Sequence, residues 1–334
     1  MVDDRRFRRW NTLRRLILPA IMLAALGALP AGHLNAAPGG GRLLGTDAFS
    51  GNLIAINPLN GQASVVGPLR VGPIPSLAVD PATGIVYAGR GGGIPDMFTV
   101  NPATGAATFL GDTGLGLAAV GALDFNLTGT LYAAVNIVGA AGTGSDHLAI
   151  IDKATGAATV IGPFGTCTDV TIPSTGAGSC TIEGMEGIAF DGTGTLWGSH
   201  RVGAAGASGL YRINVATGAA TFVAPFLDPL GGSPSGGVVS LQFGCNGTLY
   251  GGTASPVSPA TDGGNLITID SATGVFSSIG KAVPDASLGA LAFESDCTVP
   301  IIPTVSGGGM ILLALLFAVS LAWMARRRGT GGVR

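Results

Sequence analysis

Residues 97–110 read MFTVNPATGAATFL, and this pattern recurs along the chain. An apolar strand is followed by Asn or Asp, two or three residues, Gly, and a second strand rich in Ala and Thr. Because the Asn or Asp side chain bonds the backbone two residues on and Gly takes the positive φ, each copy predicts a β-hairpin. The other copies occupy residues 53–66, 148–161, 210–223 and 266–279.

A second hairpin pattern alternates with the first. It consists of an apolar strand, a turn with Asp or Asn, Gly, and a strand with an aliphatic residue beside an aromatic one. Its copies span residues 77–89, 123–134, 188–199 and 241–252. A further copy is split, because residues 291–293 supply its first strand and residues 43–46 its second.

Two hairpins form a four-stranded sheet, and five sheets of about 53 residues fill the segment 38–302, close to the size of propeller blades. Sharing one blade between both ends closes a ring. The sequence therefore predicts an all-β, five-bladed β-propeller. A six-bladed ring that uses the insert 162–185 and a pair of β-sandwiches are the alternatives. The turn and strand patterns resemble NHL-type propellers, and this resemblance implies the fold but no activity.

Composition and charge exclude several classes of protein. The 334-residue chain has 57 Gly, 47% hydrophobic residues and 11% charged residues, which excludes a disordered polyelectrolyte. The segment 38–302 carries 17 acidic and 7 basic residues, a net charge of −10. An acidic body is a poor electrostatic partner for nucleic acid, so no such partner is expected.

The segment 1–37 has the pattern of a secretory signal peptide. Six Arg residues precede the apolar run 16–29, LILPAIMLAALGAL, and small residues follow it up to Ala36 and Ala37. The alternative is a membrane-spanning helix, but this run reaches only about 21 Å, short of the ~30 Å hydrocarbon core. We therefore expect export, with cleavage near Ala36 or Ala37.

An apolar segment near the C-terminus predicts a transmembrane helix. Residues 307–325, GGGMILLALLFAVSLAWMA, form an uncharged run of 19 residues, long enough to span a bilayer. By the positive-inside rule, the residues that follow the run lie in the cytoplasm together with the short tail 329–334. These membrane-stop residues are Arg326, Arg327 and Arg328. The body is then anchored in the inner membrane and faces the periplasm.

A short motif precedes the apolar run, and it consists of Ile302, Pro303, Thr304, Val305 and Ser306. The order of motif, helix and Arg cluster over residues 303–328 resembles the IPTL-CTERM sorting signal of Gram-negative bacteria, which is similar to PEP-CTERM signals. Val305 stands where that family has Leu, and Gly308 where it has Trp. The resemblance implies processing by an exosortase-type enzyme, with sorting to the cell surface or release.

Four cysteines, Cys167, Cys180, Cys245 and Cys297, lie in the exported body, where disulfides form. Cys167 and Cys180 bracket one insertion, whereas Cys245 and Cys297 lie on equivalent turns of neighbouring blades. Of the three pairings that four cysteines allow, we expect Cys167–Cys180 and Cys245–Cys297. Zinc binding is the alternative, but the chain has no C-x-x-C pair and the body has only two histidines.

The candidate site residue is Glu186, in the segment EGMEGIAF at 183–190 that leads into a first strand. A carboxylate there resembles a metal ligand of calcium-dependent propeller lactonases and phosphoesterases. Aligned on Phe190, the corresponding residues of the other blades are Pro75, Gly121, Val239 and Gly289. One blade alone therefore supplies an acid, whereas Ca²⁺ takes about six to eight oxygens. A solvated or hydrogen-bonded glutamate is the alternative.

Other polar residues fit structural roles. Four carboxylates occupy repeated turns, which predicts turn capping by Asp80, Asp152, Asp191 and Asp270. His200 lies at the end of a strand and is a candidate channel residue, but a Ser-His-Asp triad needs placed partners. The scarce cations of the body either bind an anion or pair with acids, and pairing is the simpler expectation for Arg70, Arg90 and Arg201.

These features predict an exported, envelope-anchored, non-catalytic propeller that binds an extracellular ligand or partner, or has a structural role in the matrix, with no cofactor. The alternative is a calcium-dependent hydrolase of the lactonase or phosphoesterase type that uses Glu186 in the channel. A third hypothesis, an intracellular scaffold, conflicts with the signal peptide and the cysteines.

Overall fold

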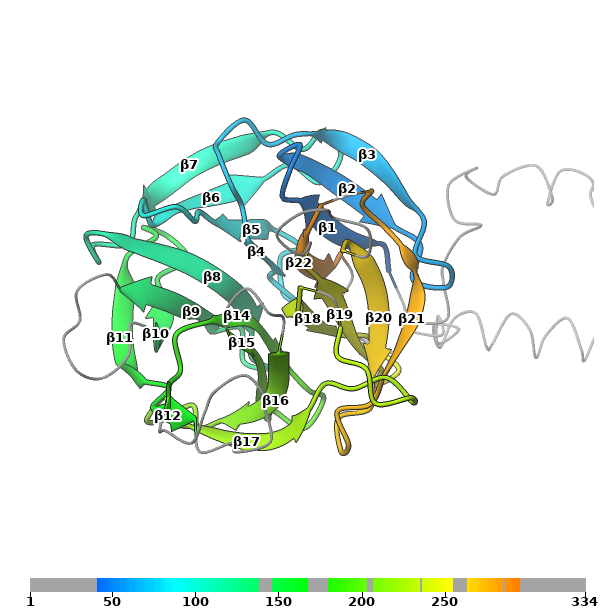
Figure 1. The fold of residues 1–334 in the computed structure, drawn as a ribbon. Coiled ribbons are helices and arrows are strands. Elements are labelled where there is room, and N and C mark those ends of the chain that lie inside the picture. The colour runs from blue at the N-terminus through cyan, green and yellow to red at the C-terminus, as the bar shows by residue number, and fades with distance from the viewer. Residues whose placement is uncertain are drawn as a thin grey trace, which may run out of the picture. The chain divides into compact units, whose positions relative to one another are not determined.

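The computed structural model describes residues 41–137, 146–167, 180–202, 207–234, 236–254, 263–284 and 286–294. These residues form β-strands and turns and contain no helix. Most of the strands belong to five sheets of four antiparallel strands, arranged around a central axis (Figure 1). The prediction of an all-β, five-bladed propeller is confirmed.

The blades are numbered along the chain, and their strands are given from the axis outward. Blade 1 has β22 (Leu288–Phe293), β1 (Leu43–Asp47), β2 (Asn52–Ile56) and β3 (Ala63–Pro68). Blade 2 has β4 (Ser76–Val79), β5 (Val86–Gly89), β6 (Asp96–Val100) and β7 (Ala107–Asp112). Blade 3 has β8 (Ala118–Phe125), β9 (Leu131–Ile137), β10 (Asp146–Ile151) and β11 (Ala158–Pro163).

The two remaining blades follow a short hairpin of β12 (Thr166–Cys167) and β13 (Cys180–Thr181). Blade 4 has β14 (Met185–Phe190), β15 (Leu196–Val202), β16 (Ala207–Ile213) and β17 (Ala220–Pro225). Blade 5 has β18 (Val238–Phe243), β19 (Leu249–Thr253), β20 (Asn265–Ile269) and β21 (Phe276–Lys281). The insert between blades 3 and 4 thus contributes a two-stranded hairpin among its described residues, and the alternative of six blades is not supported.

Blade 1 closes the ring with strands from both ends of the body. β1 pairs with β22, with Leu43 opposite Phe293 and Gly45 opposite Leu291, as the split repeat predicts. Glu294 N donates to Arg42 O over 2.9 Å. The same backbone bond joins Asn126 to Thr130 in the turn of blade 3, so the two ends of the body lie where other blades have a turn.

The predicted hairpin turns have the expected conformation. The turn glycines of the outer hairpins have φ between 70° and 81°, and they are Gly61, Gly105, Gly156, Gly218 and Gly274. In each turn, the Asn or Asp accepts a bond from the backbone two residues on, for example from Ala103 N to Asn101 Oδ1 over 2.9 Å. Turn capping by Asp80, Asp152, Asp191 and Asp270 is confirmed in the same way.

The core consists of five apolar clusters, one between each pair of neighbouring blades. The aromatic residue of each inner hairpin meets the Phe at the end of the next inner strand, as in the edge-on pair of Tyr132 and Phe190 at 5.2 Å. Comparable pairs join Tyr87 to Phe125, Trp197 to Phe243 and Tyr250 to Phe293. Aliphatic residues, Leu44 and Val79, take these places between blades 1 and 2.

Close backbone contacts between outer strands and neighbouring turns complete the ring. Gly67 of β3 lies against blade 2 so closely that a Cβ built on it would be 2.0 Å from Thr104 O. Three further blade pairs repeat the contact, through Gly111 and Thr155, Gly162 and Thr217, and Gly280 and Asn60. Between blades 4 and 5, Ala224 replaces the strand glycine, and Gly274 of the turn faces the carbonyl of Pro225.

The predicted signal peptide, the motif Ile302–Ser306, the apolar run 307–325 and the Arg cluster that follows all lie outside the described residues. Within the described residues, none of the elements is a helix with the length and hydropathy to cross a bilayer.

Candidate functional site

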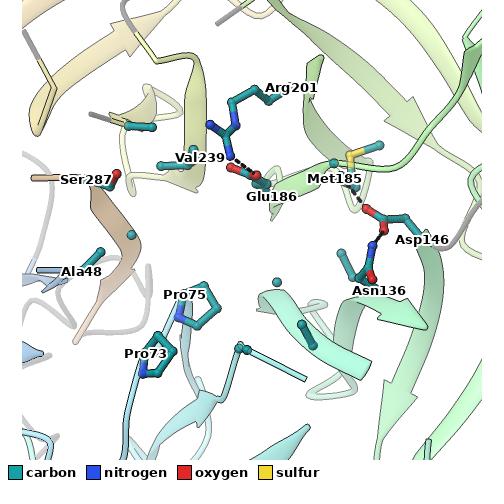
Figure 2. Close-up of a pocket in the computed structure, with 18 of the residues that line it drawn as sticks. Ala48, Pro73, Pro75, Asn136, Asp146, Met185, Glu186, Arg201, Val239 and Ser287 are labelled. Atoms are coloured by element: carbon teal, nitrogen blue, oxygen red, sulfur yellow. Dashed lines mark hydrogen bonds and ion pairs between the residues drawn. The ribbon is translucent and has the colours of Figure 1, made fainter. Parts of the chain in front are cut away.

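A pocket of about 420 Å³ lies on the axis at the end of the ring where the inner strands begin. All five blades contribute residues to its lining. In Figure 2, Glu186, Arg201, Asp146 and Asn136 lie on one side of an open space, and the two prolines lie across it. The pocket is thus polar on one side and apolar on the other.

The inner ring of lining residues is built largely from β-bulges. The pairing of β14 with β15 skips Glu186, which is therefore the extra residue of a bulge. The pairing skips Gly121, Val239 and Gly289 in the same way, and Pro75 precedes β4. A bulge re-aims its extra residue, and all five residues line the pocket. Only blade 4 places a charge at this position.

A second ring of lining residues lies near the ends of the second strands. One residue of each blade contributes, and these are Ala48, Gly91, Asn136, Arg201 and Ala254. The residue is polar only in blades 3 and 4 and is Ala or Gly elsewhere. The inner ring therefore departs from small or apolar residues in blade 4 alone, and the second ring departs from them in blade 4 and in the adjacent blade 3.

Glu186 and Arg201 form an ion pair on the pocket wall. Arg201 Nη2 donates to Glu186 Oε1 over 2.6 Å, and Nη1 lies 3.5 Å from Gly236 O. The Arg201 and Glu186 side chains are 28% and 30% exposed, so solvent screens the pair only in part. No described residue donates to Glu186 Oε2 in addition, so this oxygen is available to a ligand.

A second carboxylate, Asp146 at the start of β10, accepts hydrogen bonds from two donors among the described residues. Its Oδ1 accepts from Asn136 Nδ2 over 2.5 Å, and its Oδ2 accepts from Met185 N over 2.7 Å. Asp146 is 5% exposed. It therefore holds the Asn136 amide in place and ties blade 3 to the first residue of β14 in blade 4.

The ionisable residues give the pocket a negative charge. Its described lining contains three carboxylates, of Asp146, Glu183 and Glu186, and one guanidinium, of Arg201, which gives a net formal charge of −2. Glu183 is exposed at the rim. The pocket therefore favours ligands with hydrogen-bond donors or positive charge.

The axis is narrow beneath the pocket. The cavity there measures about 10 Å³, room for about one water molecule. Serines of the inner strands bond across neighbouring blades at this level, from Ser76 Oγ to Val120 O and from Ser240 Oγ to Leu288 O, both over 2.9 Å. A ligand larger than a water molecule therefore does not fit through this part of the axis, and we call the pocket blind in that sense.

Glu186 lies at the channel mouth, as its place in the repeat suggests, but in contact with Arg201. Among the described residues, no group of three or more His, Cys, Asp or Glu side chains is placed to hold a metal ion. Metal binding by Glu186 stays a prediction.

His200 does not line the pocket. It is 2% exposed and packs edge-on against Tyr211 at 5.7 Å, between blades 3 and 4. Burial lowers the pKa of His200 to about 4, so the imidazole is neutral at pH 7. The structure thus shows a core residue rather than a channel base.

The scarce cations mostly pair with acids, as expected. Arg90 Nη1 lies 3.3 Å from Asp96 Oδ2, and Arg201 pairs with Glu186. Arg70 makes no ion pair with any residue that the structure describes, and it adopts a φ of 61° in an exposed loop.

The structure describes part of the environment of the cysteines in the predicted disulfides. Cys167 and Cys180 are directly opposite each other in the pair β12–β13, a placement that brings Cα atoms within disulfide range. Cys245 is disulfide-bonded, whereas the side chains of the other three cysteines lie outside the described part. Both pairings stay predictions.

Sequence reasoning missed Asn136 and Asp146. Asp146 begins a third strand, a position without a repeated signature. Asn136 could have been found by extending the alignment of the repeats, because it stands where blade 4 has Arg201. At this position near the end of the second strand, the other three blades have Ala or Gly, so a polar residue in blades 3 and 4 was the sequence signal for a site.

Comparisons with known proteins identify no relative by sequence: no family model matches the chain, and no curated protein matches it. Solved structures with similar folds include one from a nidogen/laminin complex, at 14% identity and a TM-score of 0.48, covering 77% of this chain and 99% of that one. A gluconolactonase from Xanthomonas campestris has 13% identity and a TM-score of 0.42, covering 73% and 72%. The calcium-binding protein regucalcin from Agrobacterium tumefaciens has 15% identity and a TM-score of 0.39, covering 72% and 78%.

Proposed function

We propose that the protein binds a small polar ligand in the blind pocket at the channel mouth. The observation that carries this proposal is that the polar residues of the two lining rings lie side by side in two adjacent blades, as Asn136 in blade 3 and as Glu186 and Arg201 in blade 4. Ring closure and blade packing need no charge at these two ring positions, because blades 1, 2 and 5 have only Ala, Gly, Pro or Val at them. The polar arc is therefore explained by a ligand better than by the fold.

The size and chemistry of the pocket fit this role. A volume of about 420 Å³ lies within the range of roughly 300–1,000 Å³ of small-molecule sites. The half-buried ion pair and the fixed Asp146 can orient the polar groups of a bound ligand. The small residues opposite leave the cavity open for the rest of the ligand. Convergent polar groups in a mainly apolar cleft are typical of such sites.

A ligand screen on the full-length protein in detergent tests the proposal. Saturation-transfer NMR against a library of small polar compounds is expected to find binders that Gly121→Leu abolishes. Gly121 lines the pocket, and its nearest contact for an added Cβ is 3.4 Å, an ordinary distance. The matched control is Gly192→Leu in the turn of blade 4, where an added Cβ meets nothing within 4 Å. Binders unaffected by Gly121→Leu, or none at all, would overturn the proposal.

The setting of this binding role is the cell envelope in our proposal. It is supported by the sequence pattern of export signal, apolar run 307–325 and Arg cluster. Deleting residues 307–334 is expected to release the folded body into the periplasm or medium. Retention of the truncated protein in the membrane fraction would contradict the anchor.

A second candidate is a calcium-dependent hydrolase of the lactonase or phosphoesterase type. It is favoured by the convergence of oxygen donors from Asn136, Asp146 and Glu186 on one pocket, since Ca²⁺ takes oxygen ligands. Glu186 would then exchange Arg201 for the metal ion. Metal analysis of the purified protein and calcium-dependent turnover of lactones, abolished in Glu186→Gln, would support this function. Tight ligand binding unchanged by a chelator would argue against it.

A further inference from the structure

The charge on the pocket wall narrows the class of ligand, on the premise of the proposed binding function. Among the lining residues that the structure describes, there are three carboxylates and one guanidinium, and the apolar residues described opposite them carry no charge. A cationic group would lower the electrostatic energy of the pocket, whereas an anionic group would raise it. Because the walls exclude much of the solvent, these charges are screened less than on an open surface.

The ion pair shows how a cation would bind. Arg201 reaches Glu186 at 2.6 Å from the neighbouring strand of the same blade, and it thereby occupies one carboxylate oxygen of the pocket. The other oxygen of Glu186 accepts no hydrogen bond from the described residues. An ammonium group carries three donors and no acceptor, so it can share Glu186 with Arg201 while its remaining donors reach other acceptors.

The opposite wall suits the rest of such a ligand. Ala48, Pro73 and Pro75 present apolar atoms to the cavity. In Figure 2, Pro73 and Pro75 lie across the open space from the ion pair. A ligand with an ammonium at one end and an apolar ring face at the other would contact both walls.

We infer that the pocket binds a primary ammonium compound of about monosaccharide size, with Glu186 as the residue that reads its charge. Arg201 is then a competing internal cation that weakens binding of the amine. This arrangement gives the two members of one ion pair opposite effects on affinity.

Two charge series test the inference by calorimetry on the full-length protein at pH 6 and low salt. The first series is glucosamine, glucose and glucuronate, and the second is cyclohexylamine, cyclohexanol and cyclohexanecarboxylate. The amine of at least one series is expected to bind roughly tenfold more tightly than its neutral analogue. The anion is expected to bind most weakly, and high salt should reduce the preference.

Variants of the ion pair give the sharper readout. Glu186→Gln is expected to remove most of the preference for the amine, whereas Arg201→Met should increase amine affinity severalfold. The matched control is Glu294→Gln, which removes the same charge from the Arg42–Glu294 ion pair at the opposite end of the inner strands and should change nothing.

The failures are distinguishable. If screened compounds bind in the pocket but neutral or anionic analogues bind as well as the amines, or Arg201→Met weakens binding, the inference fails and the binding function stands. If no compound in the screen or in either series binds in a manner that Gly121→Leu abolishes, both fail.

Discussion

Asp124 in β8 is buried at the end of the inner strands opposite the pocket. Its Oδ2 accepts from Phe190 N over 2.6 Å, and the Gln242 side chain also bonds it. In blades 1, 2 and 4 the corresponding inner-strand residue is Ala. Burial penalises the charged form more than these hydrogen bonds favour it, so the pKa of Asp124 is raised to about 7.

This raised pKa predicts a pH-dependent stability. The folded-state pKa of Asp124 lies above the unfolded value of 3.8, so its protonated form stabilises the fold at low pH. That contribution is lost as the pH rises from about 4 through about 7, on the order of 4 kcal/mol at most. Asp124→Asn is expected to keep the bond from Phe190 N and to be more stable than the native protein at pH 7.5 but not at pH 4.5. Urea unfolding at several pH values measures the difference.

The control for Asp124 is a carboxylate with the opposite shift. Backbone hydrogen bonds from Ala272 and Thr273 lower the pKa of Asp270, whose stabilising effect is present above the unfolded pKa and is lost as the pH falls through the folded pKa. Asp270→Asn should therefore show no gain at pH 7.5. If the difference in free energy of unfolding between the native protein and Asp124→Asn is the same at pH 4.5 and at pH 7.5, Asp124 does not titrate in this range.

The five outer strands have free edges, and all five share one feature that hinders pairing with another strand. Their sequences ASVVGP, ATFLGD, ATVIGP, ATFVAP and FSSIGK carry no charge before the last position, although free edges usually carry charges against pairing. Each strand instead has a bulge, whose extra residue is aliphatic and half-buried: Val66, Leu110, Ile161, Val223 and Ile279. The bulge interrupts the regular edge and turns an apolar side chain inward.

The residue after the bulge is under steric constraint, which predicts a specific sensitivity. A Cβ on Gly111 would lie 1.8 Å from Thr155 O in blade 3, so Gly111→Ala must push two blades apart. We expect a loss of about 1–3 kcal/mol in the free energy of unfolding. Gly192→Ala, in open space at the turn of blade 4, is the matched control. Equal urea midpoints for both variants would refute a rigid contact between the blades.

The short hairpin β12–β13 supports a prediction about covalent structure. Cys167 and Cys180 are opposite each other in this pair, and a cross-strand disulfide would close the loop between them. Peptide mapping of periplasmically expressed protein without reductant should recover the two cysteines in one linked fragment, and a second fragment linking Cys245 to Cys297. Alkylation of any of the four as a free thiol would contradict these pairings.

Elements with a repeated signature could be predicted from the sequence, whereas features that depend on spatial proximity could not. The turn from Asn101 to Gly105 is encoded by local chemistry, and so its hairpin was predictable. The partner of Glu186 was not, because Arg201 reaches it only through the pairing of β14 with β15. Asp146 was hidden for the same reason: its donors come from β9 and from the first residue of β14, and no spacing in the sequence relates these segments.

At the scale of the whole ring, closure depends on strand pairing rather than on chain continuity. β1 and β22 are separated by most of the body yet pair along five positions. The Arg42–Glu294 ion pair and the backbone bond between the same residues reproduce a turn at their junction. The two ends of the body are therefore paired in the same way as the two strands of an inner hairpin.

A circular permutant tests this equivalence. Glu294 is joined to Arg42 by Leu-Thr-Gly, the sequence that links Asn126 to Thr130, and new ends are opened between Gly192 and Thr193 in the turn of blade 4. Cys245 is replaced by Ser, because its predicted disulfide partner, Cys297, is removed. Since every strand pair is retained, the permutant should keep an all-β circular dichroism spectrum and a single urea transition. Opening the chain between Gly121 and Ala122, within an inner strand, should instead prevent folding. If both permutants unfold, or both fold equally well, ring closure does not depend on the pairing of β1 with β22 in the way the structure indicates.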